Sequence, residues 1–355
     1  MSPTLLAERA TAPEMEAARA AFCPERFGFR RHQAGWVTED DGGDVAVAPL
    51  SWQHAHAVAG AERDALGFLV ELQARTWGMP PAEVVPANIL AVLADTGGSV
   101  LAAYEPMIGF DERGWLGFAI ALGGRDGTLV SHMLGVRPDV RGARGIGWRL
   151  KLIQAYLALS AGHRAATWTF DPMRGANARL NLEKLGARAE AFTIDKYGAL
   201  RSDLYGNVPS DRLTAHWDLV APATVERLRR VAAGEHRGLS PVDVSVLAEA
   251  TPNSLTAILA GRPPRLRYRV PGDIDALMRR DPERAVGWRR EMRTVLSALL
   301  PTAQALPDPD APADPTRLGV ASTPGDYAVV GFASGDDPDA PGERVGWYVL
   351  ERIGP

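Results

Sequence analysis

The stretch that decides the fold is residues 131–162, SHMLGVRPDVRGARGIGWRLKLIQAYLALSAG. A short apolar run at residues 133–136 predicts a buried strand, and Pro138 ends it before a loop of alternating arginine and glycine. From Ile146 onward apolar residues recur at helical spacing, and Gly162 can adopt the positive φ that often follows a last helical turn. The stretch therefore predicts a strand, a glycine-rich turn and the N-terminus of a helix.

A junction of this kind is suited to binding a phosphate group. The first N–H groups of a helix have no acceptor within the helix, and the helix dipole adds partial positive charge there. Glycines let the backbone approach an anion closely, and arginines add charge. The candidates in this loop are Gly142, Gly145 and Gly147, with Arg141, Arg144 and Arg149.

Three kinds of phosphate-binding loop compete for this pattern. A nucleoside-triphosphatase loop needs Lys and then Ser or Thr after the last glycine, but Trp148 and Arg149 follow Gly147. A dinucleotide-binding fingerprint needs a third small residue where Leu150 stands, although Asp171 could supply its acidic residue. The third kind is the pyrophosphate loop of acyl-coenzyme A transferases. An ordinary strand-to-helix connection without a ligand also stays open.

The loop resembles that of the GNAT superfamily of N-acyltransferases, which runs Gln or Arg, two residues, Gly, any residue, then Gly or Ala. Gly145 and Gly147 fill the two small positions. The spacing departs by one residue, because Arg141 lies four positions before Gly145 where the pattern has three. An inserted residue such as Ala143 would explain the departure, which leaves open which arginine faces the phosphates.

The order of predicted elements also resembles a GNAT domain. Apolar patterning predicts strands at 45–50, 99–104, 115–122, 129–136, 165–170, 189–194 and 213–219, and helices at 59–77, 84–93, 147–161 and 177–185. We expect a mixed α/β fold, with a GNAT-like central mixed β-sheet flanked by helices and a C-terminal α+β extension. The expected divisions are a poorly defined segment at 1–44, the GNAT-like domain at 45–220 and the extension at 221–355. Within the extension, residues 327–333 and 345–350 predict a terminal hairpin.

Further motifs narrow the resemblance. Residues 168–172, WTFDP, and 184–187, KLGA, are similar to the second half of the GNAT core. Together with SHM at 131–133 and DRL at 211–213, they resemble a subgroup of longer predicted acetyltransferases, some of them linked with N-acylamino acid metabolism. These combined motifs are fairly specific for the fold and the cofactor, but they say little about the substrate.

The resemblance implies that the chain binds acyl-CoA. The cofactor's pantetheine arm would hydrogen-bond, as if it were a strand, to the backbone of Leu134, Gly135 and Val136. Its pyrophosphate would lie on the loop formed by Arg141, Gly142, Ala143, Arg144, Gly145, Ile146, Gly147 and Trp148. Asn177, on a later helix, is a further candidate cofactor contact. The expected cofactor is acetyl-CoA or another acyl-CoA, such as succinyl-CoA.

The implied reaction is attack of an amine on a thioester carbonyl, which requires a base. His132 is the first candidate, because the pKa of imidazole lies near neutrality, and Asp171 is the second. Each also has a structural alternative: His132 could be satisfied by polar neighbours, and Asp171 could make a loop hydrogen bond. The tyrosine with which many GNAT enzymes protonate the leaving thiolate falls at Leu182, so a general acid is missing there, and Tyr197 is only a distant substitute.

Composition limits the partners and the compartment. The 355 residues carry a formal net charge of −4 with a pI near 6.0, so no overall basic field would hold nucleic acid or anionic lipid. A single cysteine, Cys23, suits a reducing cytoplasm, and no secretory signal or apolar run of membrane-spanning length is visible. We expect a cytoplasmic N-acyltransferase, acetyl or succinyl, that acts on a small-molecule amine such as an amino acid and uses no metal. The extension could line the pocket or pair two protomers in a homodimer. The alternative is a non-catalytic acyl-CoA-binding or protein-interaction module.

Overall fold

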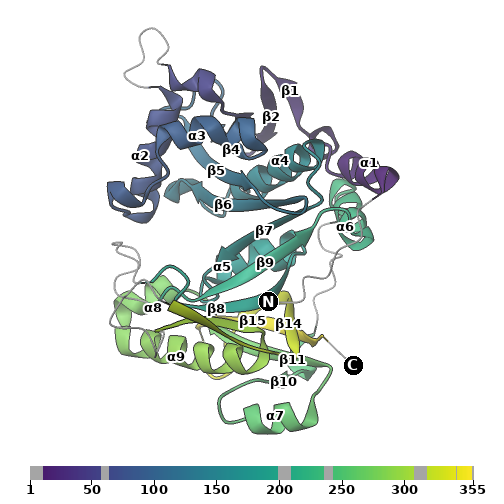
Figure 1. Cartoon of the computed structure of the whole chain (residues 1–355), viewed down its shortest axis with the longest axis vertical. Helices are drawn as coiled ribbons and strands as arrows, with labels where there is room; N and C mark the ends of the chain where they lie inside the picture. Colours follow the sequence, from purple (N-terminus) through teal and green to yellow (C-terminus); the bar gives the residue numbers. More distant parts are fainter. Residues whose placement is uncertain are drawn as a thin grey trace. The chain divides into compact units, whose positions relative to one another are not determined.

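The computed structural model describes residues 11–56, 64–198, 209–235, 243–307, 318–340 and 342–353. The chain forms two compact units (Figure 1). Unit 1 comprises Met1–Thr167 and Asp218–Gly238, and unit 2 comprises Trp168–Trp217 and Leu239–Pro355. These divisions fall elsewhere in the chain than the predicted limits at residues 44 and 220, which stay predictions.

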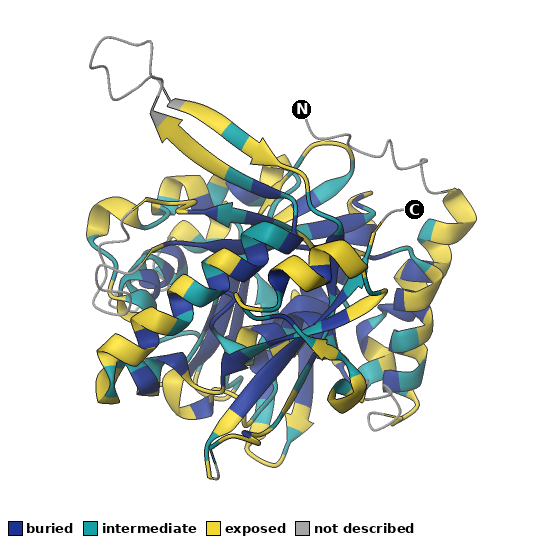
Figure 2. Cartoon of the chain, turned by 90° about the horizontal axis from the view of Figure 1, so that it is seen from below, coloured by how far each residue is buried: buried dark blue, intermediate teal, exposed yellow. Residues whose placement is uncertain are grey.

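Unit 1 is built on a sheet whose strands follow the chain order. Each strand pairs antiparallel with the next one in the chain. In order they are β1 (Arg30–His32), β2 (Gly35–Asp40), β3 (Gly43–Pro49), β4 (Ser99–Tyr104), β5 (Trp115–Gly123) and β6 (Thr128–Val136). On its other side β6 pairs in parallel with the start of β7 (Ala165–Phe170), so the sheet is mixed. Strands β4 and β5 are buried along most of their length, whereas β6 has buried and exposed residues along its length. Figure 2 shows the buried residues of the chain in dark blue and the exposed ones in yellow.

Helices cover both faces of this sheet. On one face α2 (Ala65–Trp77) and α3 (Ala87–Leu93) pack into an apolar cluster with Phe118 and Ile120 of β5. On the other face lies α4 (Ile146–Ser160), since a Cβ added to Gly117 would meet side chains of α4. Asp64 caps α2 by accepting from the Gly67 N–H, and Gly78, with φ 64°, ends it. Two further helices of the unit are α1 (Ala12–Ala21) and α6 (Pro222–Ala232).

Unit 2 holds a second set of paired strands. In spatial order they are β9 (Arg212–Asp218), β8 (Arg188–Ile194), β14 (Tyr327–Asp336), β15 (Arg344–Arg352), β11 (Arg265–Pro271) and β10 (Ala248–Glu249). β12 (Thr302–Pro307) pairs with β8 and with β13 (Leu318–Thr323). The helices of the unit are α5 (Gly175–Ala178), α7 (Leu255–Gly261), α8 (Ile274–Arg280) and α9 (Pro282–Leu299).

The predicted fold class is confirmed, because a mixed sheet with helices on both faces forms the centre of unit 1. The predicted terminal hairpin is also confirmed, as β14 and β15. Two details differ. Strands β1 and β2 occupy the segment 1–44, and the helix predicted at 177–185 is α5 followed by a π-helical turn, Arg179–Lys184. The predicted start of α2, at residues 59–63, lies outside the described residues. No helix in the described residues is long and apolar enough to cross a membrane.

Candidate functional site

One edge of β6 has no strand partner over its second half. The pairing with β7 involves residues 128–130 of β6, and none follows in the described part of the chain. The N–H of Arg137 donates to the Leu116 carbonyl at 2.9 Å, so it points across the strand pair to β5. Because neighbouring N–H groups alternate in direction, those of Val136 and Leu134 point to the unpartnered edge. That edge can therefore form a ladder with an extended ligand.

The turn between β6 and α4 presents unbonded amides at the end of this edge. For the N–H groups of residues 142–148, no acceptor is found among the described residues. Gly142 and Gly145 have φ of 81° and 59°, and a Cβ added to either would meet no atom within 4 Å. Gly145 is the N-cap of α4, so the positive end of the helix dipole lies at the same place. Open space, free donors and this dipole suit a pyrophosphate.

The three arginines of the loop have different environments. Arg141 is exposed, and its Nη2 donates to the Val136 carbonyl at 3.3 Å, so its charge lies beside the open edge of β6. Arg144 and Arg149 are directed to Asp40 of β2, with Nε of Arg144 at 3.0 Å and Nη1 of Arg149 at 2.8 Å from its carboxylate. Burial raises the pKa of Asp40, but the amide and the guanidinium groups around it outweigh this effect and lower that pKa. Arg141 is thus the arginine available to phosphate.

The remaining predicted residues of the loop contribute to its support. Ile146 is buried beneath the sheet, and Trp148 packs edge-to-face against Phe27 with ring centroids 5.4 Å apart. Ala143 and Gly142 are exposed, whereas Gly135 is buried on β6. The structure therefore brings the strand residues 134–136 and the loop residues 141–148 together in one unit.

His132 lies on β6 next to this site. The strand has one residue more than β5 here, because Ala121 pairs with Ser131 and Ile120 with Met133, so His132 has no partner across the pair. The resulting β-bulge interrupts the regular alternation of side chains along the strand. The side chain is accessible to solvent, and partial desolvation lowers the pKa of His132. The imidazole is therefore neutral at pH 7 and able to accept a proton.

Asp171 is in unit 2, where it is engaged in an ion pair. It is 3% exposed, and both of its carboxylate oxygens accept from the guanidinium of Arg289, at 3.3 and 3.0 Å. Its Oδ1 also accepts from the Met173 N–H. Burial raises the pKa of Asp171, but the charge and hydrogen bonds of Arg289 outweigh burial and lower it. A carboxylate held in this way favours its structural alternative over the predicted catalytic role.

Three other candidates also belong to unit 2. Asn177 is exposed on α5. Leu182, at the position of the expected tyrosine, is 2% exposed within the π-helical turn and cannot donate a proton. The hydroxyl of Tyr197 lies 2.9 Å from Oγ1 of Thr169, and the guanidinium of Arg212 is 5.5 Å from its ring centroid. Tyr197 is therefore oriented by its neighbours, but it is not on the late helix.

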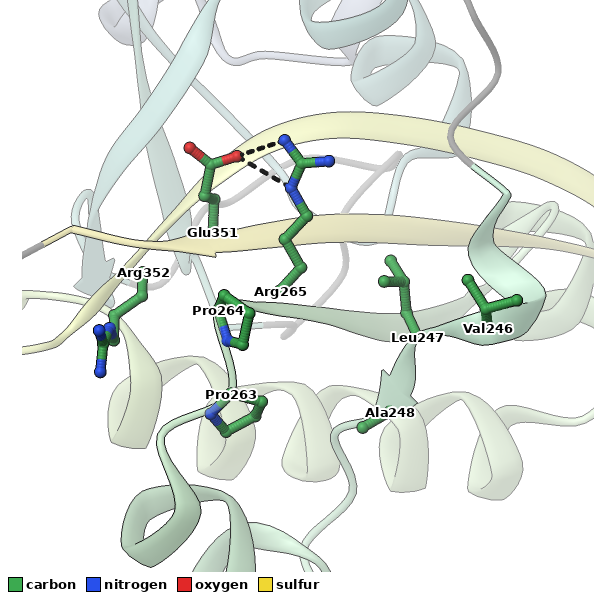
Figure 3. Close-up of a pocket in the computed structure, with 8 residues that line it drawn as sticks. All are labelled: Val246, Leu247, Ala248, Pro263, Pro264, Arg265, Glu351 and Arg352. Atoms are coloured by element: carbon green, nitrogen blue, oxygen red, sulfur yellow. Dashed lines mark hydrogen bonds and ion pairs between the residues drawn. The ribbon is translucent and has the colours of Figure 1, made fainter.

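A pocket on unit 2 contains none of the predicted residues. Its walls include Pro263 and Pro264, and Arg265, whose guanidinium is paired with Glu351 at 2.9 Å (Figure 3). No His, Cys, Ser or Tyr lines it, and its one carboxylate, Glu351, is paired with Arg265. Across the described residues, no group of three or more His, Cys, Asp or Glu is arranged to hold a metal ion.

Comparison with known proteins gives similarities of fold only. No protein-family model matches the chain, and no curated protein is detectably similar to it in sequence. Among solved structures, an IAA acetyltransferase from Bacillus cereus is 16% identical, with a TM-score of 0.35, over 49% of this chain and 99% of that one. For an N-acetyltransferase from Staphylococcus aureus the values are 13%, 0.36, 49% and 98%. For a GNAT family acetyltransferase from Elizabethkingia anophelis with acetyl-CoA bound they are 12%, 0.33, 49% and 97%. Similarities at these values do not establish a family.

Two charged residues close to the predicted site are absent from the sequence predictions. Asp40 is 104 positions from Arg144 in the chain, and no local pattern marks it as the partner. Lys151 is buried on α4 with 4% exposure. Its signal was present in the sequence, since it is a single charge within the apolar run LKLIQAYLAL at residues 150–159.

Proposed function

We propose that the chain is an acyl-CoA-dependent N-acyltransferase of the GNAT type. The observation that carries the proposal is the continuity of two binding features: the unpartnered edge of β6 at residues 134–136 leads directly into the unbonded amides of residues 142–148. An extended pantetheine arm followed by a pyrophosphate has the shape and charge to use both.

The proposed reaction needs few groups from the protein. An N–H on the open edge of β6 hydrogen-bonds to the thioester oxygen and stabilises the negative charge that develops there. The neutral imidazole of His132 takes the proton from the attacking amine, the carbon–nitrogen bond forms, and the carbon–sulfur bond breaks to release the thiolate. Because thiolates leave readily, water can supply their proton where Leu182 replaces the expected tyrosine.

The finer assignments are also part of the proposal. We propose acetyl-CoA as the donor, with succinyl-CoA as an alternative, and a small-molecule amine such as an amino acid as the acceptor, because of the subgroup that the sequence resembles. The proposed location is the cytoplasm, where the unpaired thiol of Cys23 would stay reduced. A homodimer remains a proposal of the same kind.

A second candidate function is binding of acyl-CoA without turnover. Two observations favour it: Leu182 is buried where a general acid is expected, and Asp40 occupies two of the three loop arginines. A thiol-release assay with acetyl-CoA and succinyl-CoA against a panel of amino acids separates the two candidates. Turnover of any acyl-CoA donor with any amino acid of the panel supports the transferase. Calorimetric binding of CoA without turnover across the panel supports the binding module, and absence of both removes the site from either role.

A further inference from the structure

Lys151 is a buried amine on a helix that is otherwise apolar at its buried positions, apart from Gln154. Its Nζ lies 2.8 Å from Oγ of Ser131 on β6, and both residues are 4% exposed. The hydrogen bond joins α4 to β6 one residue before His132. It therefore fixes the strand at the point where the pairing with β7 has ended and the open edge begins.

The β-bulge at His132 decides which face of the sheet Ser131 occupies. Met133 packs against the cluster under α2 and α3. In a regular strand Ser131 would share that apolar face, because side chains two residues apart point the same way. Its hydroxyl instead meets Lys151 on the α4 face. A one-residue shift in the register between β5 and β6 that removed the bulge would direct the Ser131 hydroxyl into the apolar cluster. Lys151 would then lose this acceptor.

We propose that Lys151 is a positioning residue, which holds the bulge in β6 through Ser131 and thereby places His132 and the open edge at Leu134 and Val136 for acyl transfer. The inference rests on the proposed function, because it assigns Lys151 a part in the same site. In this proposal Lys151 acts through Ser131.

The cost of burying the amine supports this role. Burial lowers the pKa of Lys151 to about 7, which shows how much hydration the group has lost. An apolar side chain of similar length would fill the same space without that cost. Filling the core therefore does not account for an amine at this position, whereas holding a hydroxyl does, since either protonation state can donate to Ser131.

The test compares Lys151→Met with Ser131→Ala, which removes the acceptor and leaves the amine. Each is expected to lower kcat about tenfold or more. The affinity for CoA is expected to fall less than kcat does, because the phosphate loop is untouched although the edge that binds the pantetheine arm is loosened. The double variant is expected to lose little beyond either single change. Ser131→Thr keeps the hydroxyl and is expected to restore most of kcat.

Gln154→Met is the matched control. Gln154 is a buried polar residue on the same helix, 2% exposed, and its amide nitrogen has no hydrogen-bond partner among the described residues. We expect this variant to keep the wild-type kcat. An unchanged kcat in Lys151→Met, fully additive losses in the double variant, or an equal loss in Gln154→Met would each overturn the proposal.

Hydrogen exchange separates this proposal from the proposed function. Amides of residues 132–136 are expected to exchange faster in Lys151→Met and in Ser131→Ala than in wild type or Gln154→Met, whether or not the protein turns over. Faster exchange without any wild-type turnover would retain Lys151 as the support of the bulge and reject the transferase. Unchanged exchange in both variants would reject the support itself.

Discussion

The carboxylate of Asp40 lies 3.0 Å from Nε of Arg144, and this ion pair joins β2 to the loop between β6 and α4. The same carboxylate accepts from Arg149, and Arg144 also donates to the Gly43 carbonyl at 2.8 Å. Two of the three arginines that mark the loop in the sequence are therefore used to hold the loop against β2. In the proposed site Arg141 is therefore the arginine that contacts the ligand, whereas Arg144 and Arg149 support the loop.

Arg141→Ala is expected to weaken CoA binding about three- to tenfold and leave the thermal midpoint unchanged, because Arg141 is exposed beside the loop. Arg144→Ala is expected to lower the thermal midpoint, because it removes a partner from the shielded Asp40. Calorimetry at two salt concentrations and thermal unfolding measure both effects. If Arg144→Ala lost affinity while its midpoint stayed unchanged, the assignment of the two arginines would be reversed.

Gly145→Glu is expected to abolish CoA binding while the fold survives. The added carboxylate would stand at the amides that hold the pyrophosphate and repel it, and the left-handed backbone at φ 59° would cost about 1 to 2 kcal/mol. Gly145→Asn is the control, since Asn tolerates this conformation and carries no charge. Circular dichroism checks the fold, and calorimetry checks binding. Equal affinity in Gly145→Glu and wild type would exclude the loop as the phosphate site.

His132→Ala is expected to lower kcat about a hundredfold or more and to change the affinity for CoA little. Because desolvation lowers the pKa of His132, kcat/KM should stay level above neutral pH and fall only as the imidazole becomes protonated at lower pH. The glutamine amide in His132→Gln does not accept a proton at neutral pH, so this variant should have the same low kcat as His132→Ala. An active His132→Ala enzyme with the same pH profile would remove His132 from the chemistry.

The folding stability should depend on pH through Lys151. The pKa of its amine falls from 10.5 in the unfolded chain to about 7 in the fold. Between these values only the unfolded chain binds the proton, so the contribution of Lys151 to the free energy of unfolding rises with pH by at most about 1.4 kcal/mol per unit. Below pH 7 the amine is charged in both states, and the full cost of burial is present.

Lys151→Met lacks this dependence. Urea denaturation of the variant and the wild type, measured at several pH values from about 6 to about 10, should show that the variant's advantage in stability shrinks as pH rises. Subtracting the two curves removes the groups that both proteins share. Parallel curves would mean that the amine is hydrated in the fold.

Asp171→Ala is expected to destabilise unit 2 by about 3 to 5 kcal/mol, because it leaves the guanidinium of Arg289 buried without its main partner. The double variant Asp171→Ala with Arg289→Met should recover part of the loss. Activity per folded molecule should fall far less than in His132→Ala. A large loss of kcat in a stable Asp171→Asn protein would instead support the catalytic role predicted from the sequence.

The sequence was most informative where local chemistry specifies the backbone. The glycines at 142 and 145 adopt the positive φ that only small residues take easily, and α4 begins within one residue of the predicted start. Helical and alternating patterns likewise located α2, α3 and β4 to β6. Strands β1 and β2 were missed, because the polar segment RRH at Arg30–His32 and an acidic turn gave no clear alternation.

Long-range relationships could not be predicted in this way. Asp40 meets Arg144 because β2 and the loop converge in the fold, and Asp171 meets Arg289 across 118 positions of the chain. The bulge at His132 depends on the register between β5 and β6, which a pattern along one strand does not contain. These contacts decide which charged residues bind a ligand and which support the fold.

A crystal structure of the protein with CoA tests the proposed cofactor site most directly. We expect pyrophosphate oxygens within hydrogen-bonding distance of N–H groups of residues 142–148, and the pantetheine arm hydrogen-bonded to the backbone of Leu134 and Val136 along the open edge of β6. A bound CoA whose pyrophosphate lies elsewhere, with those amides directed to protein or water, would contradict the proposed site.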